Sequence, residues 1–315
     1  MSKKYIGVDL GAWYSKKNKT SIVVLVLEDT GKKLKIDKII SKESEISCIA
    51  QSDDVTLKDY EIKNKKLIDC LLKERGSSQT VIGIDAPFAI PAKLSNSNEK
   101  YYDLTYRSDK LKQHHNPYLF DNSARFVLNT TKQTVLAPCA TLVGSLTARM
   151  KHIVDEYKKG LNIICNPIDL KECGISTIEV FPTATLYQLI QNTPLCKNKY
   201  IKPYTKDEKE IDDFTKLRSY KNDNWTKYNK IRMIKLLETY ICNLSDKIEE
   251  IKTDDDYDAI ICALTAYLVS QKNGYLKPNN EDKDKFTNSF IYIPSFKNTL
   301  KEMQNHTKVE DILLG

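Results

Sequence analysis

The tightest constraint on the fold comes from the order of apolar runs in residues 1–87. Residues 4–9 (KYIGVD) predict a short strand, and the β-branched run 21–28 (SIVVLVLE) predicts a second one. The turn DTGK at 29–32 leads to a third run, 34–39, in which apolar residues are interleaved with Lys and Asp. The pattern therefore predicts an antiparallel meander of three strands, of which the third is the most exposed.

A helix and a fourth strand follow this meander. Apolar residues recur at helical spacing over 62–72, and the pattern ends at Gly76. The run 80–85 is apolar up to Asp85 and is closed by Pro87, which is typical of a buried parallel strand. A right-handed crossover places this strand parallel to the first and beside it. The remaining expected elements are a helix at 141–157, a strand at 176–181, helices at 226–251 and 255–271, and a short strand at 291–293.

These elements predict an α/β fold with a mixed sheet, antiparallel in its first three strands and parallel afterwards, flanked by helices. With 41% hydrophobic residues, the chain can bury the core of a single domain over residues 1–315. Residues 92–138 are polar and irregular and predict an inserted loop or lid region. Residues 197–235 predict a second insertion, which is rich in basic and aromatic residues.

The N-terminal residues and the cysteines favour a cytoplasmic protein. Asp9 and several lysines interrupt any apolar run of signal-peptide length in residues 1–17. The longest apolar runs are far shorter than the about 20 residues that cross a bilayer, so we expect no membrane association. The 8 cysteines form no CxxC pair and have no His at zinc-finger spacing, which is typical of ordinary thiols in a reducing compartment.

Almost all of the net charge of +7 lies in residues 197–235, which contain 12 Lys or Arg and 6 Asp or Glu, a net of +6. Aromatic side chains are interleaved with these charges. Because basic groups neutralise phosphates and rings stack on unpaired bases, the segment suits a nucleic-acid partner. The alternative is a solvated helix face. The candidate nucleic-acid contacts in this segment are Lys221, Trp225, Lys227 and Arg232.

Three acidic residues fall inside otherwise apolar strands. Asp9 ends the first strand, Asp85 ends the fourth, and Glu179 lies in the strand at 176–181. A carboxylate on a central strand must be paired, hydrogen-bonded or bound to a metal, since its desolvation alone costs several kcal/mol. The C-terminal ends of neighbouring parallel strands converge on one crevice in an open α/β sheet, so we expect these three acids to meet there.

A fourth acidic cluster begins the helix at 255–271. Asp258 is three residues from Asp255 and four from Asp254, so these three side chains share one helical face, whereas Asp256 is expected to face away. Asp254 and Asp255 also suit capping roles at a helix N-terminus. Asp258 lies on the same helix as Ala259, Ala263 and Ala266, and these small residues favour close packing on a sheet that carries Asp258 to the strand ends.

Carboxylates without a competing His or Cys site favour a hard cation, Mg²⁺ or Mn²⁺. Two such ions held by shared carboxylates activate water and stabilise the leaving oxygen in phosphodiester hydrolysis. In this hypothesis Asp9 bridges two metals, and Asp85 and Glu179 complete one site each. Asp258, helped by Asp255, holds the metal that activates water. The alternative is that these acids are separate caps and surface residues.

Four short motifs occur in order over about residues 4–268: IGVD at 6–9, IDAP at 84–87, EVFP at 179–182 and D-x-Y-D-A at 255–259. This ordered set resembles the DUF429 family of predicted ribonuclease H-like nucleases. The resemblance implies a ribonuclease H-like core with Asp9, Asp85, Glu179 and Asp258 as metal-binding acids. It implies that Asp255 is a second helix acid, as in RuvC-type resolvases. It also implies that Arg107 binds phosphate, although Arg107-Ser108-Asp109 has one residue fewer between its charges than the family's segment.

Two other functions start from the same residues. The run Ile6–Gly11 is similar to the first phosphate loop of actin-like and sugar-kinase ATPases, which implies an ATP-binding phosphotransferase. Asp85 is followed by Ala-Pro, however, and not by the Gly that the second loop of those proteins carries. A nucleic-acid-binding module that keeps the fold without catalysis is the other alternative.

Overall fold

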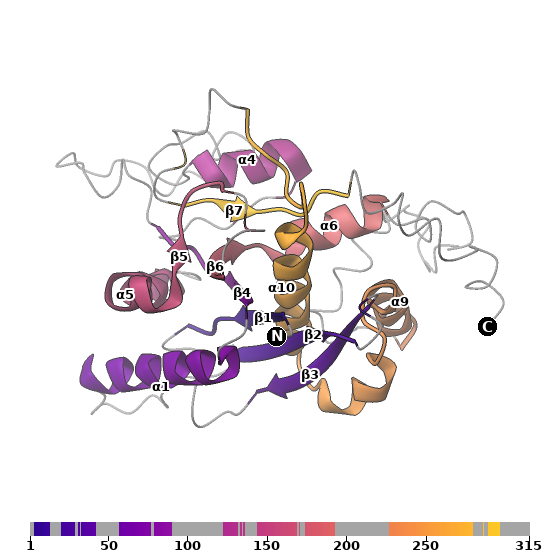
Figure 1. Ribbon diagram of the computed structural model, residues 1–315, viewed down its shortest axis with the longest axis horizontal. Helices are drawn as coiled ribbons and strands as arrows, with labels where there is room; N and C mark the ends of the chain where they lie inside the picture. The colour runs from indigo at the N-terminus through magenta and orange to yellow at the C-terminus, as the bar shows by residue number, and fades with distance from the viewer. Residues whose placement is uncertain are drawn as a thin grey trace, which may run out of the picture.

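The computed structural model shows an α/β architecture built on one mixed sheet (Figure 1). It describes residues 3–12, 20–28, 31, 33–41, 57–76, 79–89, 122–131, 133, 135, 144–168, 170, 174–192, 227–279, 286 and 289–296. For residues 57, 122, 190–191 and 227–232 only the backbone is described.

The first three strands form the predicted antiparallel meander. Strand β1 (Lys4–Asp9) pairs antiparallel with β2 (Ser21–Leu27), which in turn pairs antiparallel with β3 (Leu34–Ile40). Strand β4 (Thr80–Asp85) lies parallel to β1 on its other side. The predicted position of the fourth strand, parallel to the first and beside it, is therefore confirmed.

The sheet continues beyond β4 with β6 (Ile175–Val180), which runs parallel to it. The outer edge of β6 pairs first with β5 (Ile163–Ile164) and then with β7 (Ile291–Tyr292), both parallel. The resulting order is β3-β2-β1-β4-β6-β5, with β7 beside β6. The β-branched and apolar content of these strands suits a sheet whose two faces are both covered.

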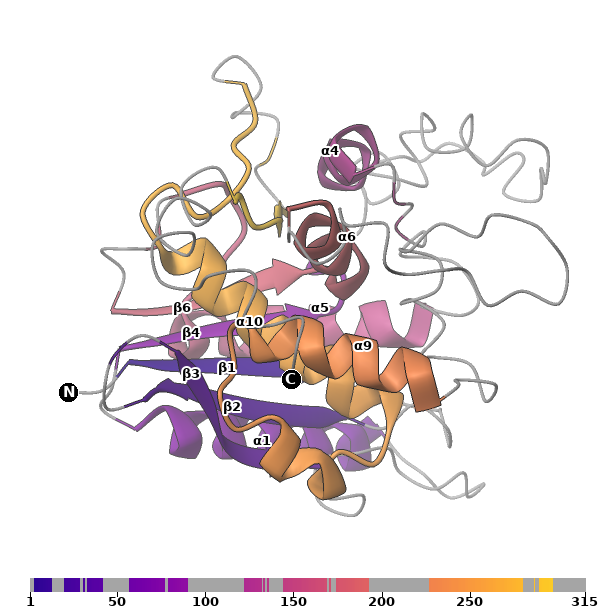
Figure 2. The ribbon, with the colours of Figure 1, turned by 90° about the vertical axis from the view of Figure 1, so that its right-hand side faces the viewer.

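Helices cover both faces of the sheet, as Figures 1 and 2 show. Helices α1 (Leu57–Arg75) and α5 (Gly144–Leu161) pack on one face. Helices α9 (Lys227–Glu238) and α10 (Asp254–Ser270) pack on the other face. Among the residues described, no helix is both long and apolar enough to cross a membrane.

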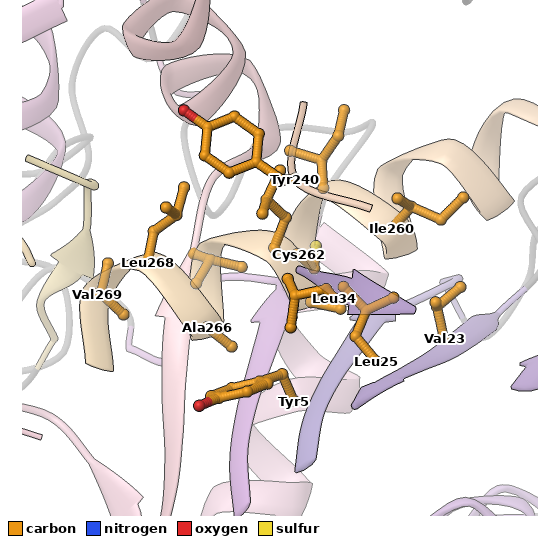
Figure 3. Close-up of a cluster of buried hydrophobic side chains, with 14 of the residues drawn as sticks. Tyr5, Val23, Leu25, Leu34, Tyr240, Ile260, Cys262, Ala266, Leu268 and Val269 are labelled. Atoms are coloured by element: carbon orange, nitrogen blue, oxygen red, sulfur yellow. The ribbon is translucent and has the colours of Figure 1, made fainter. Parts of the chain in front are cut away.

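Side chains alternate between these two layers along each strand. Ile6 and Val8 of β1 lie in the core with α1 and α5, whereas Tyr5 lies in the core with α10. Figure 3 shows the core on the α10 side of the sheet, in which Tyr5 and Leu25 of the sheet face Cys262 and Ala266 of α10. Asp9 therefore falls on the α10 face, since it lies four residues beyond Tyr5 on the same strand.

Helix α10 touches the backbone of two central strands because these strands carry glycine at the contact. A Cβ on Gly7 would lie 1.9 Å from the Ala259 carbonyl oxygen and 2.3 Å from the Ala263 amide nitrogen. A Cβ on Gly83 of β4 would lie 2.7 Å from the Cys262 carbonyl oxygen. The close packing expected from the alanines of this helix is confirmed, and it needs glycine on the sheet as well as alanine on the helix.

Two predicted segments are wrong in part. The region 92–138 was expected to be irregular, but residues Asn122–Thr131 form helix α4. This helix packs through Val127 on Ala184 of helix α6 (Pro182–Asn192) and on Ile291 of β7. Neither α4 nor α6 is predicted from the sequence, because each is short and gains its stability from this tertiary contact.

The helix predicted at 226–251 is also wrong in its length, since α9 ends at Glu238. Beyond it, the Leu34 amide of β3 donates to the Tyr240 carbonyl, and the Cys242 amide donates to the Leu34 carbonyl, each at 2.8 Å. The Asn243 side chain accepts from the Ile36 amide at 2.7 Å and donates to its carbonyl at 3.0 Å. Pairing with the edge of β3 therefore replaces the helical hydrogen bonds, and a 3₁₀ turn at Ser245–Glu250 follows.

The substitution Gly7→Ala tests the contact between α10 and the sheet. We expect it to lower the free energy of unfolding by about 3 kcal/mol, because the added Cβ meets backbone atoms that can move only with the whole helix. Denaturant unfolding followed by circular dichroism measures the change. Gly174→Ala is the matched control, since nothing lies within 4 Å of its Cβ position and its φ is not positive. Equal stability of the two variants would refute the contact.

Candidate functional site

Asp9 and Asp85 lie side by side at the C-terminal ends of two parallel strands. They are Cα partners in the β1–β4 pairing, so their side chains project from the same face of the sheet. Both are half-buried. This face is the one that α10 covers, because Gly7 and Gly83, two residues earlier on the same strands, touch that helix.

Helix α10 runs antiparallel to β1 and brings its N-terminal turn to these two carboxylates. The ring of Tyr267 packs on that of Tyr5 at 5.1 Å between centroids, whereas Ala259 contacts Gly7 further along the strand. One helical turn rises about 5.4 Å, close to the length of two strand residues. Asp255, one turn before Ala259, is therefore placed at the level of Asp9.

The same arithmetic places Asp258 near the end of β4. Cys262 contacts Gly83, and Asp258 lies one turn before Cys262, as Asp85 lies two residues after Gly83. Asp258 is 4% exposed, so its carboxylate lies under the surface of the protein. The structure thus brings four of the five predicted acids, Asp9, Asp85, Asp255 and Asp258, to one edge of the sheet.

The start of α10 is fixed by a capping box. The Thr253 side chain accepts a hydrogen bond from the Asp256 amide at 3.3 Å, and the Asp256 carboxylate accepts from the Thr253 amide at 3.0 Å. The same Asp256 oxygen, Oδ2, accepts from the Lys252 amide at 2.9 Å. These bonds satisfy donors that a helix N-terminus otherwise leaves open. They also fix the position of Asp255 and Asp258 along the helix axis.

Asp256 also ties α10 to the sheet, which corrects the expectation that it faces away. It is fully buried, and the Ser21 hydroxyl donates to its Oδ1 at 2.6 Å. Ser21 begins β2 and is the register partner of Asp9. Asp256 therefore anchors the helix beside the candidate acids rather than joining them. The Thr-x-x-Asp spacing at 253–256 was the sequence signal for this role.

Glu179 lies on the opposite face of the sheet. It is the Cα partner of Ile84, which belongs to the core with α1 and α5. Its Oε2 accepts from the Ser289 hydroxyl at 2.6 Å and from the Phe88 amide at 3.2 Å. Glu179 is 5% exposed and joins the chain after β4 to the segment before β7. The structure thus does not bring it to the face on which Asp9 and Asp85 lie.

The donor set suits a hard cation in its chemistry, because four carboxylates supply oxygen ligands and neither His nor Cys competes with them. In the described parts of the chain, no three His, Cys, Asp or Glu side chains come together closely enough to hold an ion between them.

The predicted nucleic-acid contacts fall largely outside the part of the structure that is described. Arg107, Lys221 and Trp225 lie outside the described residues. Lys227 and Arg232 belong to α9, of which only the backbone is described at these positions. Figure 2 shows α9 on the same side of the sheet as α10.

The phosphate-loop interpretation concerns Gly11, two residues after Asp9. Its amide, which that interpretation would direct at a phosphate, donates to the Thr20 hydroxyl at 3.2 Å. Thr20 is fully buried immediately before β2. The amide is therefore engaged within the protein.

Tyr257 gives a pH test of how firmly the N-terminal turn of α10 is buried. Burial, and secondarily the Asp256 carboxylate, raises the pKa of its phenol to about 12 from an ordinary value near 10. The neutral form is the one that the fold stabilises, so stability is full below pH 10 and is lost as the pH rises toward 12. We expect the free energy of unfolding of Tyr257→Phe to fall less than that of the wild type between pH 9 and 12, because the variant has no phenol to ionise. Denaturant unfolding of both proteins at pH 9 and pH 12 measures the two changes in stability. Equal changes in the wild type and the variant would contradict this expectation.

Searches of protein-family models, of curated proteins and of solved structures found no match to this chain.

Proposed function

We propose that this protein is a cation-dependent nuclease that hydrolyses phosphodiester bonds of DNA or RNA. The observation that carries the proposal is the pairing of Asp9 with Asp85 at the C-terminal ends of β1 and β4, with the acidic first turn of α10 at the same edge. The C-terminal ends of neighbouring parallel strands are where open α/β sheets bind ligands, so paired carboxylates at these ends favour a functional site.

The sheet order supports a ribonuclease H-like core as part of this proposal. Three antiparallel strands are followed by parallel ones in the order β3-β2-β1-β4-β6, with helices on both faces. This arrangement is compatible with that fold. Fold alone supports many activities, so the site carries the functional argument.

The residues proposed to hold two Mg²⁺ or Mn²⁺ ions are Asp9, Asp85 and Asp258, with Asp255 beside them. When bound, such ions lower the pKa of a water molecule and neutralise the charge that develops on phosphate oxygens. The protein's own contribution is orientation. The Asp256 bonds to Ser21 and Thr253 fix the level of the helix acids, and the contact of α10 with Gly7 holds the helix against β1.

Glu179 has a different part in this proposal. Its bond to the Phe88 amide fixes the chain three residues beyond Asp85, and its bond to the Ser289 hydroxyl fixes the segment before β7. We therefore assign it to the orientation of the β4 exit. The basic segment 197–235 is proposed to hold the backbone of the nucleic acid, with α9 at its end on the α10 side of the sheet.

Cleavage assays test the proposal directly. The wild type is incubated with single- and double-stranded DNA, RNA and RNA–DNA hybrids in Mg²⁺ or Mn²⁺. We expect cleavage of at least one substrate, and a fall of about 100-fold or more in rate for Asp9→Asn and Asp258→Asn, because each loses a charged oxygen at the reacting centre. Asp254→Asn is the matched control, since Asp254 is an exposed acid in the same helical turn.

The outcomes separate the three candidate functions. If the wild type cleaves none of these substrates but binds one of them, the protein is the inactive binding module. If it hydrolyses ATP instead, the phosphotransferase replaces the nuclease. If Asp254→Asn lowers the rate of cleavage as much as Asp258→Asn does, the acids act only through the overall negative charge of this helical turn.

Thermal unfolding provides a second test that needs no substrate. We expect Asp85→Asn to abolish the stabilisation that Mn²⁺ gives the wild type, because an amide replaces a charged oxygen ligand. The measurement is the change in Tm on addition of Mn²⁺. A stabilisation by Mn²⁺ that survives in Asp85→Asn would remove Asp85 from the proposed site.

A further inference from the structure

Arg149 of α5 is one of the largest fully buried side chains in the described structure, with 1% of its surface exposed. Burial of a guanidinium group is costly unless its donors are satisfied by well-placed acceptors. Its position on the α1 and α5 side places it across the sheet from α10. The sequence around it gives no signal for a special role, because a lone Arg within a helix carries no motif.

Two of the hydrogen bonds of Arg149 join the ends of the connection between β1 and β2. Its Nη1 donates to the Gly11 carbonyl at 2.5 Å and to the Thr20 hydroxyl at 3.0 Å. The Gly11 amide donates to the same Thr20 hydroxyl at 3.2 Å. Arg149, Gly11 and Thr20 therefore form a closed set of contacts just beyond the C-terminal end of β1.

A third bond connects this set to helix α1. Arg149 Nε donates to Asn64 Oδ1 at 2.9 Å, and Asn64 is itself fully buried. The other polar atom of Asn64, Nδ2, lies 3.1 Å from His152 Nδ1, one turn further along α5. The guanidinium group is thus bound to α1 through Nε and to the two ends of the β1–β2 connection through Nη1.

We propose that Arg149 is a positioning residue that fixes the exit of β1, and with it Asp9, at the acidic edge of the sheet. The inference rests on the proposed function for its role in cation binding. Asp9 lies two residues before Gly11, so a rotation of the chain at Gly11 would change the direction of its carboxylate. The planar, rigid fork of Arg supplies donors to all three acceptors at once, which the single ammonium of Lys does not.

The experiment compares Arg149→Lys with Arg75→Lys. Arg75 also links the two helices of this face, by donating to the Gly160 carbonyl at 3.0 Å, but it lies at the other end of the strands, shortly before β4. We expect Arg149→Lys to weaken Mn²⁺ binding, measured by electron paramagnetic resonance, by about tenfold or more. We also expect faster hydrogen exchange of the amides at 9–11. Arg75→Lys is expected to change neither quantity.

Thr20→Val serves as a second variant, since it keeps the shape of the side chain and removes the hydroxyl that Arg149 and the Gly11 amide share. We expect it to show the same two effects, and it decides the question if Arg149→Lys does not fold. Wild-type Mn²⁺ affinity and amide exchange in a folded Thr20→Val would overturn the inference. If the wild type binds no Mn²⁺, the proposed function fails, and the positioning role is then decided by amide exchange at 9–11 alone.

Discussion

Helix α10 is positioned by a direct backbone contact with the two central strands of the sheet. This contact exists because Gly7 and Gly83 have no side chain where Ala259 and Cys262 approach. The contact fixes the helix at a height at which its first turn reaches the ends of β1 and β4. A larger residue at either glycine would push the helix away from the sheet and would disturb the acidic edge and the main core together, since they share the same helix.

Three buried polar groups stabilise this edge from different sides. Asp256 joins the start of α10 to Ser21 of β2, and Glu179 joins the exit of β4 to the segment before β7. Arg149 joins the exit of β1 to α1 and α5. Each is satisfied by several hydrogen bonds, as a buried charge requires. Each of them acts at a point where a strand or helix meets the edge that carries Asp9 and Asp85.

The meander, the crossover and the parallel fourth strand could be predicted because their patterns are local and strongly periodic. The helices at 122–131 and 182–192 could not, since both are short and depend on contact with each other and with β7. The end of α9 at Glu238 was missed because the competing partner, the edge of β3, lies about 200 residues away in sequence. Helix periodicity alone does not reveal that β2 covers the side of the helix on which Asp256 lies.

The first four strands and the acids that end β1 and β4 could be read from the sequence, because alternation and helical spacing are properties of neighbouring residues. The face on which each acid lies is set by the pairing of the strands in the sheet. Asp9 and Asp85 share a face because the parallel register aligns them, and Glu179 falls on the other face because it is aligned with Ile84. A shift by one residue exchanges the two faces of a strand, and register is set by the whole sheet.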